Sequence, residues 1–230
     1  MLKYLFLFIC ITTNVQAQIM LPAFQAVQYK NSGIVIPSVT IGTQNWMTKN
    51  LDVATYRDGT PIPQVTDPTA WANLTTGAWC YYNNDPANGL IYGKLYNWYA
   101  VAGIHDNDPN TPNKTLSPLG YHIPTDGEWT SLTDYLGGQV LAGGKMKATG
   151  TSLWYSPNTN ATNESGFTGI PGGYRSATLF KFIGVDGFWW SSSAYNSTDA
   201  WHRYVYFDDG ITGKATINVL SGFSVRCIKD

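Results

Sequence analysis

The chain has 230 residues, of which only 13% are charged and 14% are aromatic, including nine tryptophans and fifteen tyrosines. Its formal net charge of −1 excludes the basic surface that nucleic acid requires and the polybasic run that anionic lipid attracts. So few charges leave Asn, Thr, Ser, Gly and aromatic edges to cover the surface, as in extracellular proteins.

The first 17 residues have the order of a secretory signal peptide. A lysine precedes an apolar run over residues 4–11, and Ala17 completes the small-residue pattern at which signal peptidase cuts. The run is too short to span a bilayer. A bulky isoleucine before Cys10 argues against a lipoprotein signal. We therefore expect an exported protein that begins at Gln18 and lies at the cell surface, in the periplasm or outside the cell.

Residues 18–37 mix apolar and polar residues without a sustained period, and we expect a leader there. Residues 38–230 have a length that suits one domain. Its first element is predicted at Val39-Thr-Ile41, where alternating apolar residues followed by Gly42 indicate a short strand and a turn.

Aromatic residues mark the next predicted elements. Trp71 lies in a segment that suits one helical turn, and residues 78–82 are rich in strand formers. Apolar residues then recur at helical spacing over residues 95–102, which predicts a helix that ends at Gly103.

A polar loop at residues 105–113 carries Asp106, Asp108 and Asn110 in an alternating order that resembles the oxygen spacing of a calcium loop. It lacks the glycine and the late bidentate glutamate of an EF-hand, and Asp/Asn/Pro clusters are ordinary in loops. These three residues are weak candidates for a metal site, and we expect no cofactor.

The clearest local signal is a helix start at Thr125. Thr125 followed by Glu128 has the spacing of a capping box, in which each side chain bonds to the other residue's main-chain amide. Apolar residues then fall on one helical face, at Trp129, Leu132, Tyr135 and Leu136. Gly137-Gly138 is expected to end the helix. Thr125, Glu128 and Trp129 are therefore assigned structural roles.

The last third of the chain is predicted to form short strands. After a short strand or turn at residues 143–147, strand-forming segments occur at residues 166–175, 187–193, 201–207 and 221–228. Asp208-Asp-Gly210 suits a tight hairpin between two of the strands.

Four segments resemble known families. Gly120-Tyr-His-Ile-Pro-Thr-Asp-Gly-Glu-Trp129 resembles a signature of formylglycine-generating-enzyme/sulfatase-modifying domains. Closer resemblance to the Fibrobacter succinogenes major paralogous domain family lies in Val39-Thr-Ile-Gly-Thr-Gln-Asn-Trp-Met-Thr-Lys-Asn-Leu51, Tyr92-Gly-Lys-Leu-Tyr-Asn-Trp-Tyr99 and Gly222-Phe-Ser-Val-Arg-Cys-Ile228.

The resemblance implies a fold but not a ligand. It implies an exported bacterial protein with an α+β, C-type-lectin-like fold, in which two helices pack on short, mostly antiparallel sheets and the terminal strands pair. The biochemical role of this family is largely unassigned.

An enzyme is not expected, because the related oxidases bind copper through two closely placed thiols late in the chain and this region offers only Cys227. An oxidase of the formylglycine-generating type is a remote alternative.

In an oxidising compartment, Cys80 and Cys227 are expected to form a disulfide. The alternative is a pair of buried thiols that pack as small apolar side chains.

We expect a non-catalytic binding module that recognises a glycan or a surface protein through its late loops, with a structural or surface-display protein as the alternative. The candidate ligand-binding residues are Tyr174, Arg175, Trp189, Trp190, Tyr195, Trp201, Arg203 and Asp208. Because Trp189 and Trp190 are consecutive, one indole is expected to face the core and the other to face outward or into the loop layer. The alternative for each candidate aromatic is that it belongs to the core.

Overall fold

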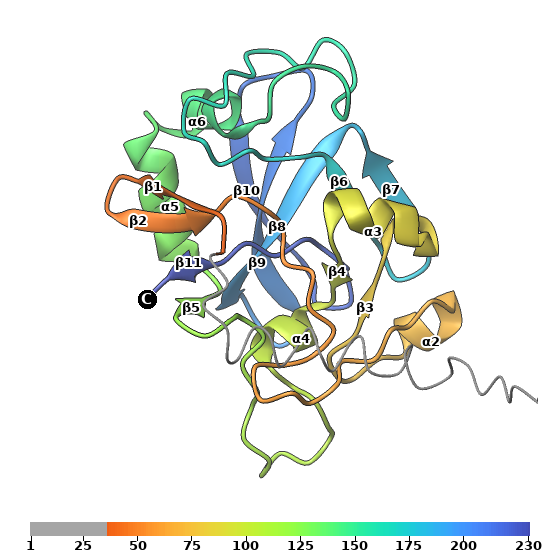
Figure 1. The fold of residues 1–230 in the computed structure, drawn as a ribbon. Helices are drawn as coiled ribbons and strands as arrows, with labels where there is room; N and C mark the ends of the chain where they lie inside the picture. The colour runs from red at the N-terminus through yellow and green to blue at the C-terminus, as the bar shows by residue number, and fades with distance from the viewer. Residues whose placement is uncertain (1–35) are drawn as a thin grey trace, which may run out of the picture.

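The beginning and the end of the domain meet in one sheet in the computed structural model, which describes residues 36–230. The sheet has the order β1–β2–β11–β5, with bounds Ser38–Ile41, Gln44–Met47, Ile228–Lys229 and Tyr121–His122. Ile228 pairs with Trp46 of β2 and with His122 of β5, antiparallel in both cases. The expected pairing of the terminal strands is thus confirmed, and Figure 1 shows β11 beside the β1–β2 hairpin.

The predicted signal peptide and all but the last two residues of the predicted leader lie outside the described residues. Within residues 36–230, no helix has the length and apolar character needed to cross a membrane.

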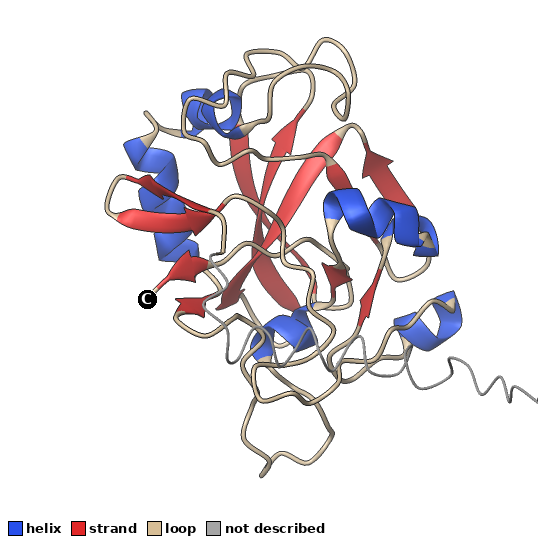
Figure 2. Ribbon diagram, viewed as in Figure 1, coloured by secondary structure: helices blue, strands red, loops and turns tan. Residues whose placement is uncertain are grey.

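A three-stranded antiparallel sheet occupies the centre of the domain (Figures 1 and 2). Its order is β10–β9–β8, with bounds Thr212–Asn218, Asp199–Tyr206 and Asp186–Ala194. Two smaller sheets pair β3 at Trp79–Cys80 with β4 at Leu95–Tyr96, and β6 at Gly172–Arg175 with β7 at Phe180–Ile183. Asp208, Asp209 and Gly210 connect β9 to β10, as predicted. The architecture is therefore a mixed α+β fold of several small antiparallel sheets.

Residues 221–228 form a connecting segment rather than the one continuous strand that was predicted for them. Gly222 bridges Arg175, Phe223 bridges Tyr96, and Ser224 bridges Trp189. The segment contacts strands of three different sheets by single bridges, so only its last residues form a regular strand.

Helix α5 at Asp126–Tyr135 begins with the predicted capping box. The Glu128 amide donates to Thr125 Oγ1 at 3.2 Å, and the Thr125 amide donates to Glu128 Oε2 at 2.8 Å. Gly137 and Gly138, with φ of 100° and 85°, follow its end as predicted. Tyr135 was expected on the buried face, but it is 66% exposed, with its ring next to Gly42 in the β1–β2 turn.

Helix α6 at Gln139–Met146 corrects the prediction of a strand or turn at residues 143–147. A Cβ on Gly143 would lie 2.4 Å from the Ile211 carbonyl oxygen, and one on Gly144 would lie 2.4 Å from that of Asn160. The two glycines therefore do not break the helix. They let its backbone approach two loops closely.

The remaining helical segments are short: α2 at Pro68–Ala72, η1 at Tyr82–Asn84, α3 at Pro86–Tyr92 and α4 at Trp98–Ala102. The helix predicted over residues 95–102 begins only at Trp98, because Leu95 and Tyr96 form β4. Asn97 caps α4 by accepting from the Ala100 amide at 3.0 Å, and Gly103 ends it with φ of 78°.

Tryptophan fills the core on both faces of the central sheet. Trp189 packs with Trp129 and Phe167 on one face, and Trp190 packs with Phe223 on the other. The consecutive indoles do point to opposite faces, but both are fully buried because the central sheet is covered on both sides. The expectation that one of them faces outward or into the loop layer was wrong.

Cys80 and Cys227 are free and buried, so the expected disulfide is not present. Cys80 packs with Trp71 and Leu95, whereas Cys227 belongs to a different core cluster. Burial raises the pKa of Cys80 to about 11 and that of Cys227 to about 12. Both thiols therefore stay protonated at neutral pH and pack as small apolar groups.

Three buried cations hold the irregular parts of the chain together. Lys147, Arg175 and Arg226 are at most 1% exposed, and none forms an ion pair with a carboxylate of the described residues. Each donates to three main-chain carbonyls and lies over an aromatic ring. Because these carbonyls belong to loops and strand ends, the cations satisfy polar groups that no ladder partner reaches.

Lys147 gives the sharpest test of this role. Its ammonium donates to the carbonyls of Thr159, Tyr206 and Asp209 at 2.8, 2.8 and 2.6 Å. Replacing it with methionine keeps the apolar stem and leaves three buried carbonyls without their donor, so Lys147→Met should lower the free energy of unfolding by on the order of 3 kcal/mol. Urea denaturation measures this loss.

The matched control is Lys145→Met in the last turn of α6, two residues before Lys147. Lys145 pairs with Glu164 at 3.5 Å, and the Glu164 side chain is 66% exposed, so its loss should cost at most about 0.5 kcal/mol. Equal effects of the two substitutions would contradict a structural role for the buried ammonium.

The free thiols predict a labelling result. Alkylation of residues 18–230 without reductant should give two labelled cysteines after unfolding, because Cys80 and Cys227 are unbridged, and few in the native state, because both are buried. Mass spectrometry counts the adducts. No adducts in denaturant would show a disulfide instead.

Candidate functional site

A cleft of about 1020 Å³ opens beside the short strand β3. Its lining comes from residues 52–58, from residues 111–119, which are hydrogen-bonded to the first segment, and from Gln64, Trp79, Tyr81 and Lys94. Trp79 and Tyr81 are two positions apart, so they share a face of the extended chain, and their rings pack edge to face at 5.1 Å. These two rings form the aromatic base of the cleft, and irregular segments supply most of the remaining lining.

A buried lysine fixes one side of this aromatic base. Lys94 is 5% exposed, and its ammonium forms an ion pair with Asp52 Oδ1 and donates to the Asp52 carbonyl at 3.3 Å. The same ammonium lies 4.5 Å from the ring centre of Trp79 and 5.0 Å from that of Tyr81. Lys94 thus orients the Asp52 carboxylate at the edge of the cleft.

Arg57 holds the second of these segments, because it donates to the carbonyls of Ser117, Pro118 and Tyr121 at 2.9, 2.7 and 2.6 Å. Next to it, Asp58 pairs with Lys114 at 2.5 Å. The hydrogen bond from Lys114 lowers the pKa of Asp58 to about 2. Both carboxylates in the cleft are therefore paired with lysines.

Several polar groups of the cleft remain available for a ligand. The side chains of Thr55, Gln64 and Asn113 form no hydrogen bond to any part of the chain that the structure describes, and neither does Asp52 Oδ2. Their oxygens and amides can donate and accept without breaking an internal contact.

The eight residues predicted to bind a ligand do not share one face. Arg175, Trp189, Trp190 and Arg203 are buried, and Tyr174 is half-buried against Phe182, Phe188 and Phe223. Tyr195 and Trp201 lie together at the β8–β9 turn, with their ring centres 5.3 Å apart. Asp208 is exposed in the β9–β10 connection. Arg175 serves the structure, because it donates to the carbonyls of residues 65–67.

The weak metal candidates form ordinary loop contacts. Asp106 Oδ1 accepts from the Asp108 amide at 3.0 Å, and Asp108 Oδ1 accepts from the Asn110 amide at 2.9 Å. These are Asx turns. Over residues 36–230, no cluster of three or more histidine, cysteine, aspartate or glutamate side chains has a geometry suited to a metal ion.

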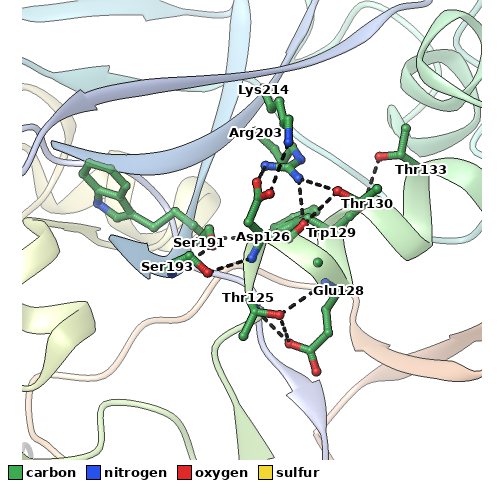
Figure 3. Close-up of polar contacts among 12 residues, drawn as sticks. Thr125, Asp126, Glu128, Trp129, Thr130, Thr133, Ser191, Ser193, Arg203 and Lys214 are labelled. Atoms are coloured by element: carbon green, nitrogen blue, oxygen red, sulfur yellow. Dashed lines mark hydrogen bonds and ion pairs between the residues drawn. The ribbon is translucent and has the colours of Figure 1, made fainter. Parts of the chain in front are cut away.

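Arg203 is part of a polar network at the start of α5 (Figure 3). It donates to Asp126 Oδ1 at 2.7 Å and to the Asp126 carbonyl at 2.9 Å, and Lys214 lies 3.2 Å from Asp126 Oδ2. Burial alone would raise the pKa of Asp126, but bonds from Arg203 and Lys214 lower it. The network ties α5 to β9 and β10, so Arg203 has a structural role.

His122 connects the capping box to the end of the chain. Its Nε2 lies 2.8 Å from Glu128 Oε1, and its Nδ1 lies 2.7 Å from Asp230 Oδ1. Partial burial alone would lower the pKa of His122, but the two carboxylates outweigh it and raise this pKa. The protonated imidazole can donate to both partners at once, whereas the neutral ring can donate to only one.

Because the folded pKa of His122 is raised, its stabilising effect should be fully present below about pH 6.5 and lost as the pH rises through the folded value. His122→Gln should therefore lower the melting temperature by roughly 1–3 °C more near pH 5.5 than near pH 9. Thermal denaturation of both proteins at the two pH values measures this. An equal loss at both values would contradict the charged bridge.

Sequence reasoning missed the cleft. Asp52 and Lys94 are 42 residues apart, and Lys94 lies in a segment valued only for its helical spacing and family resemblance. The sequence did offer one signal: Lys94 stands between Gly93 and Leu95, in an otherwise uncharged segment. A lysine in such a segment is buried only when it has a charged partner.

Comparison with known proteins identifies a family for this chain. The family model described as the Fibrobacter succinogenes major domain matches residues 39–229, which is nearly the whole described chain. No curated protein and no solved structure matches the chain significantly. The chain belongs to the Fibrobacter succinogenes major domain family.

Proposed function

We propose that this chain is an exported, non-catalytic recognition module with a C-type-lectin-like fold, which binds a glycan or a protein of the cell exterior. The single observation that carries the proposal is the cleft beside β3, with its aromatic base and its unbonded polar groups. Clefts of roughly 300–1,000 Å³ with a few convergent polar groups are the usual sites for small ligands.

The charged groups of the cleft support recognition rather than catalysis. Lys94 is bonded to Asp52, and Lys114 is bonded to Asp58. A general acid or base needs a pKa near the working pH, whereas the pKa of Asp58 is lowered to about 2. The His122 bridge and the Asp126 network lie at α5 and do not line this cleft.

The fold supports a lectin-like assignment in two respects. The terminal strands meet in one sheet, and helix α5 packs beside the central sheet through the contacts of Asp126 with Arg203. The cleft differs from the site expected from the sequence, since it uses early and middle loops instead of the loops after residue 174.

Two tyrosines distinguish the cleft from the late loops. Tyr81→Ala should weaken binding of a ligand found on a glycan or protein array by about tenfold or more, because it removes half of the aromatic base. Tyr195→Ala, at the β8–β9 turn, should change the affinity less than about twofold. Titration calorimetry gives both affinities, and circular dichroism checks folding. The reverse order would place recognition in the late loops.

A further inference from the structure

We infer that the ligand of the cleft is an uncharged saccharide, which stacks on Tyr81 and is hydrogen-bonded by the outer oxygen of Asp52 and the side-chain amide of Gln64. The inference rests on the proposed function and names the ligand class and the residues that select it.

The charge pattern of the cleft favours an uncharged ligand. The lining holds two carboxylates, Asp52 and Asp58, and three cations, Arg57, Lys94 and Lys114. The carboxylates pair with the two lysines, and Arg57 is bonded to the main-chain carbonyls of Ser117, Pro118 and Tyr121. An ionic ligand would compete with these existing contacts for its counterion, whereas an uncharged ligand would leave them intact.

Asp52 is built to accept hydroxyl groups. Its Oδ1 is held by Lys94, which is more than nine-tenths buried. The Asp52 side chain itself is 47% exposed. Oδ2 has no hydrogen-bond partner in the described chain, so a carboxylate of fixed orientation presents a free acceptor to the cleft. A charge-assisted bond from a ligand hydroxyl to this oxygen would be short and directional.

The aromatic base complements the other side of a sugar ring. Tyr81 is half-buried, with one part of its ring against Gly89 of α3, and Trp79 lies beneath it at 7% exposure. A saccharide has apolar C–H faces and hydroxyl edges, so it can cover Tyr81 while its hydroxyls reach Asp52 and Gln64. The volume of about 1020 Å³ leaves room for more than one ring.

A peptide fits the cleft less well. An extended peptide gains most of its affinity by adding a strand to an exposed sheet edge. Here β3 pairs with β4 on one side, and Gln64 bridges Trp79 on the other. The Trp79 amide donates to the Pro63 carbonyl at 3.0 Å, and its carbonyl accepts from the Val65 amide at 2.9 Å. The strand at this site therefore offers no free edge.

The test compares neutral oligosaccharides, acidic oligosaccharides and peptides as ligands of the full exported chain. Titration calorimetry at about 0.05 M and about 0.5 M salt separates charge-driven from neutral binding. We expect saturable binding of a neutral oligosaccharide that changes less than twofold with salt. Asp52→Asn and Gln64→Ala should each weaken it at least about fivefold.

Asp58→Asn is the matched control, because both Asp58 oxygens are already bonded, to the Thr60 amide and to Lys114. It should leave the affinity within about twofold. Since Asp52→Asn also loosens Lys94, the surface variant Gln64→Ala keeps the test valid if that protein unfolds.

Two results would overturn the inference, and they differ in what they say of the proposed function. Salt-dependent binding of an acidic glycan or a peptide that needs Tyr81 would leave a recognition module with a different ligand. No saturable binding of any of the three classes would overturn the inference and the proposed function together.

Discussion

The fold depends on the contact between Asn50 and Arg226, which lie at opposite ends of the domain. Asn50 Oδ1 accepts from Arg226 Nε at 2.7 Å and from the Trp189 indole at 2.9 Å. Its amide donates to the Tyr92 carbonyl at 2.9 Å and to Ser224 Oγ at 3.1 Å. The Asn50 side chain therefore uses all four of its hydrogen bonds. They join the segment after β2 to α3, to the central sheet and to residues 224–226.

The cleft follows from this contact. Leu51 donates to the Val225 carbonyl at 2.8 Å, and its own carbonyl accepts from the Lys94 amide at 3.4 Å. The next residue is Asp52. The contact between Asn50 and Arg226 therefore positions the backbone of Asp52, whose carboxylate is the proposed acceptor, and of Lys94, which orients that carboxylate. The strands nearest the cleft have two residues each, and hydrogen bonds from Arg57 and Lys94 to main-chain carbonyls hold the irregular segments of its lining. Arg57 donates to the carbonyls of residues 117 and 118 beside the cleft, as Arg226 donates to those of residues 167 and 168 in the core.

Local signals were predictable from the sequence, and long-range contacts were not. Thr125 and Glu128 specify their helix start within four residues, and Gly103 ends α4 at the expected place. The glycines of α6 misled, because the same residue breaks a helix or permits a close approach depending on what lies opposite. One of Trp189 and Trp190 was expected to face outward or into the loop layer, because strand alternation cannot show that both faces of the central sheet are covered. The cleft escaped prediction because Asp52 meets Lys94 only in three dimensions.

A double-mutant cycle on Asn50 and Arg226 tests this account most directly. The free energies of unfolding of Asn50→Ala, Arg226→Met and the double variant are measured by urea denaturation against the unmodified protein. The account predicts a coupling energy above about 1 kcal/mol between the two sites, because each residue satisfies the other's buried group. Additive losses within about 0.5 kcal/mol would contradict it, since residues that do not interact behave in that way.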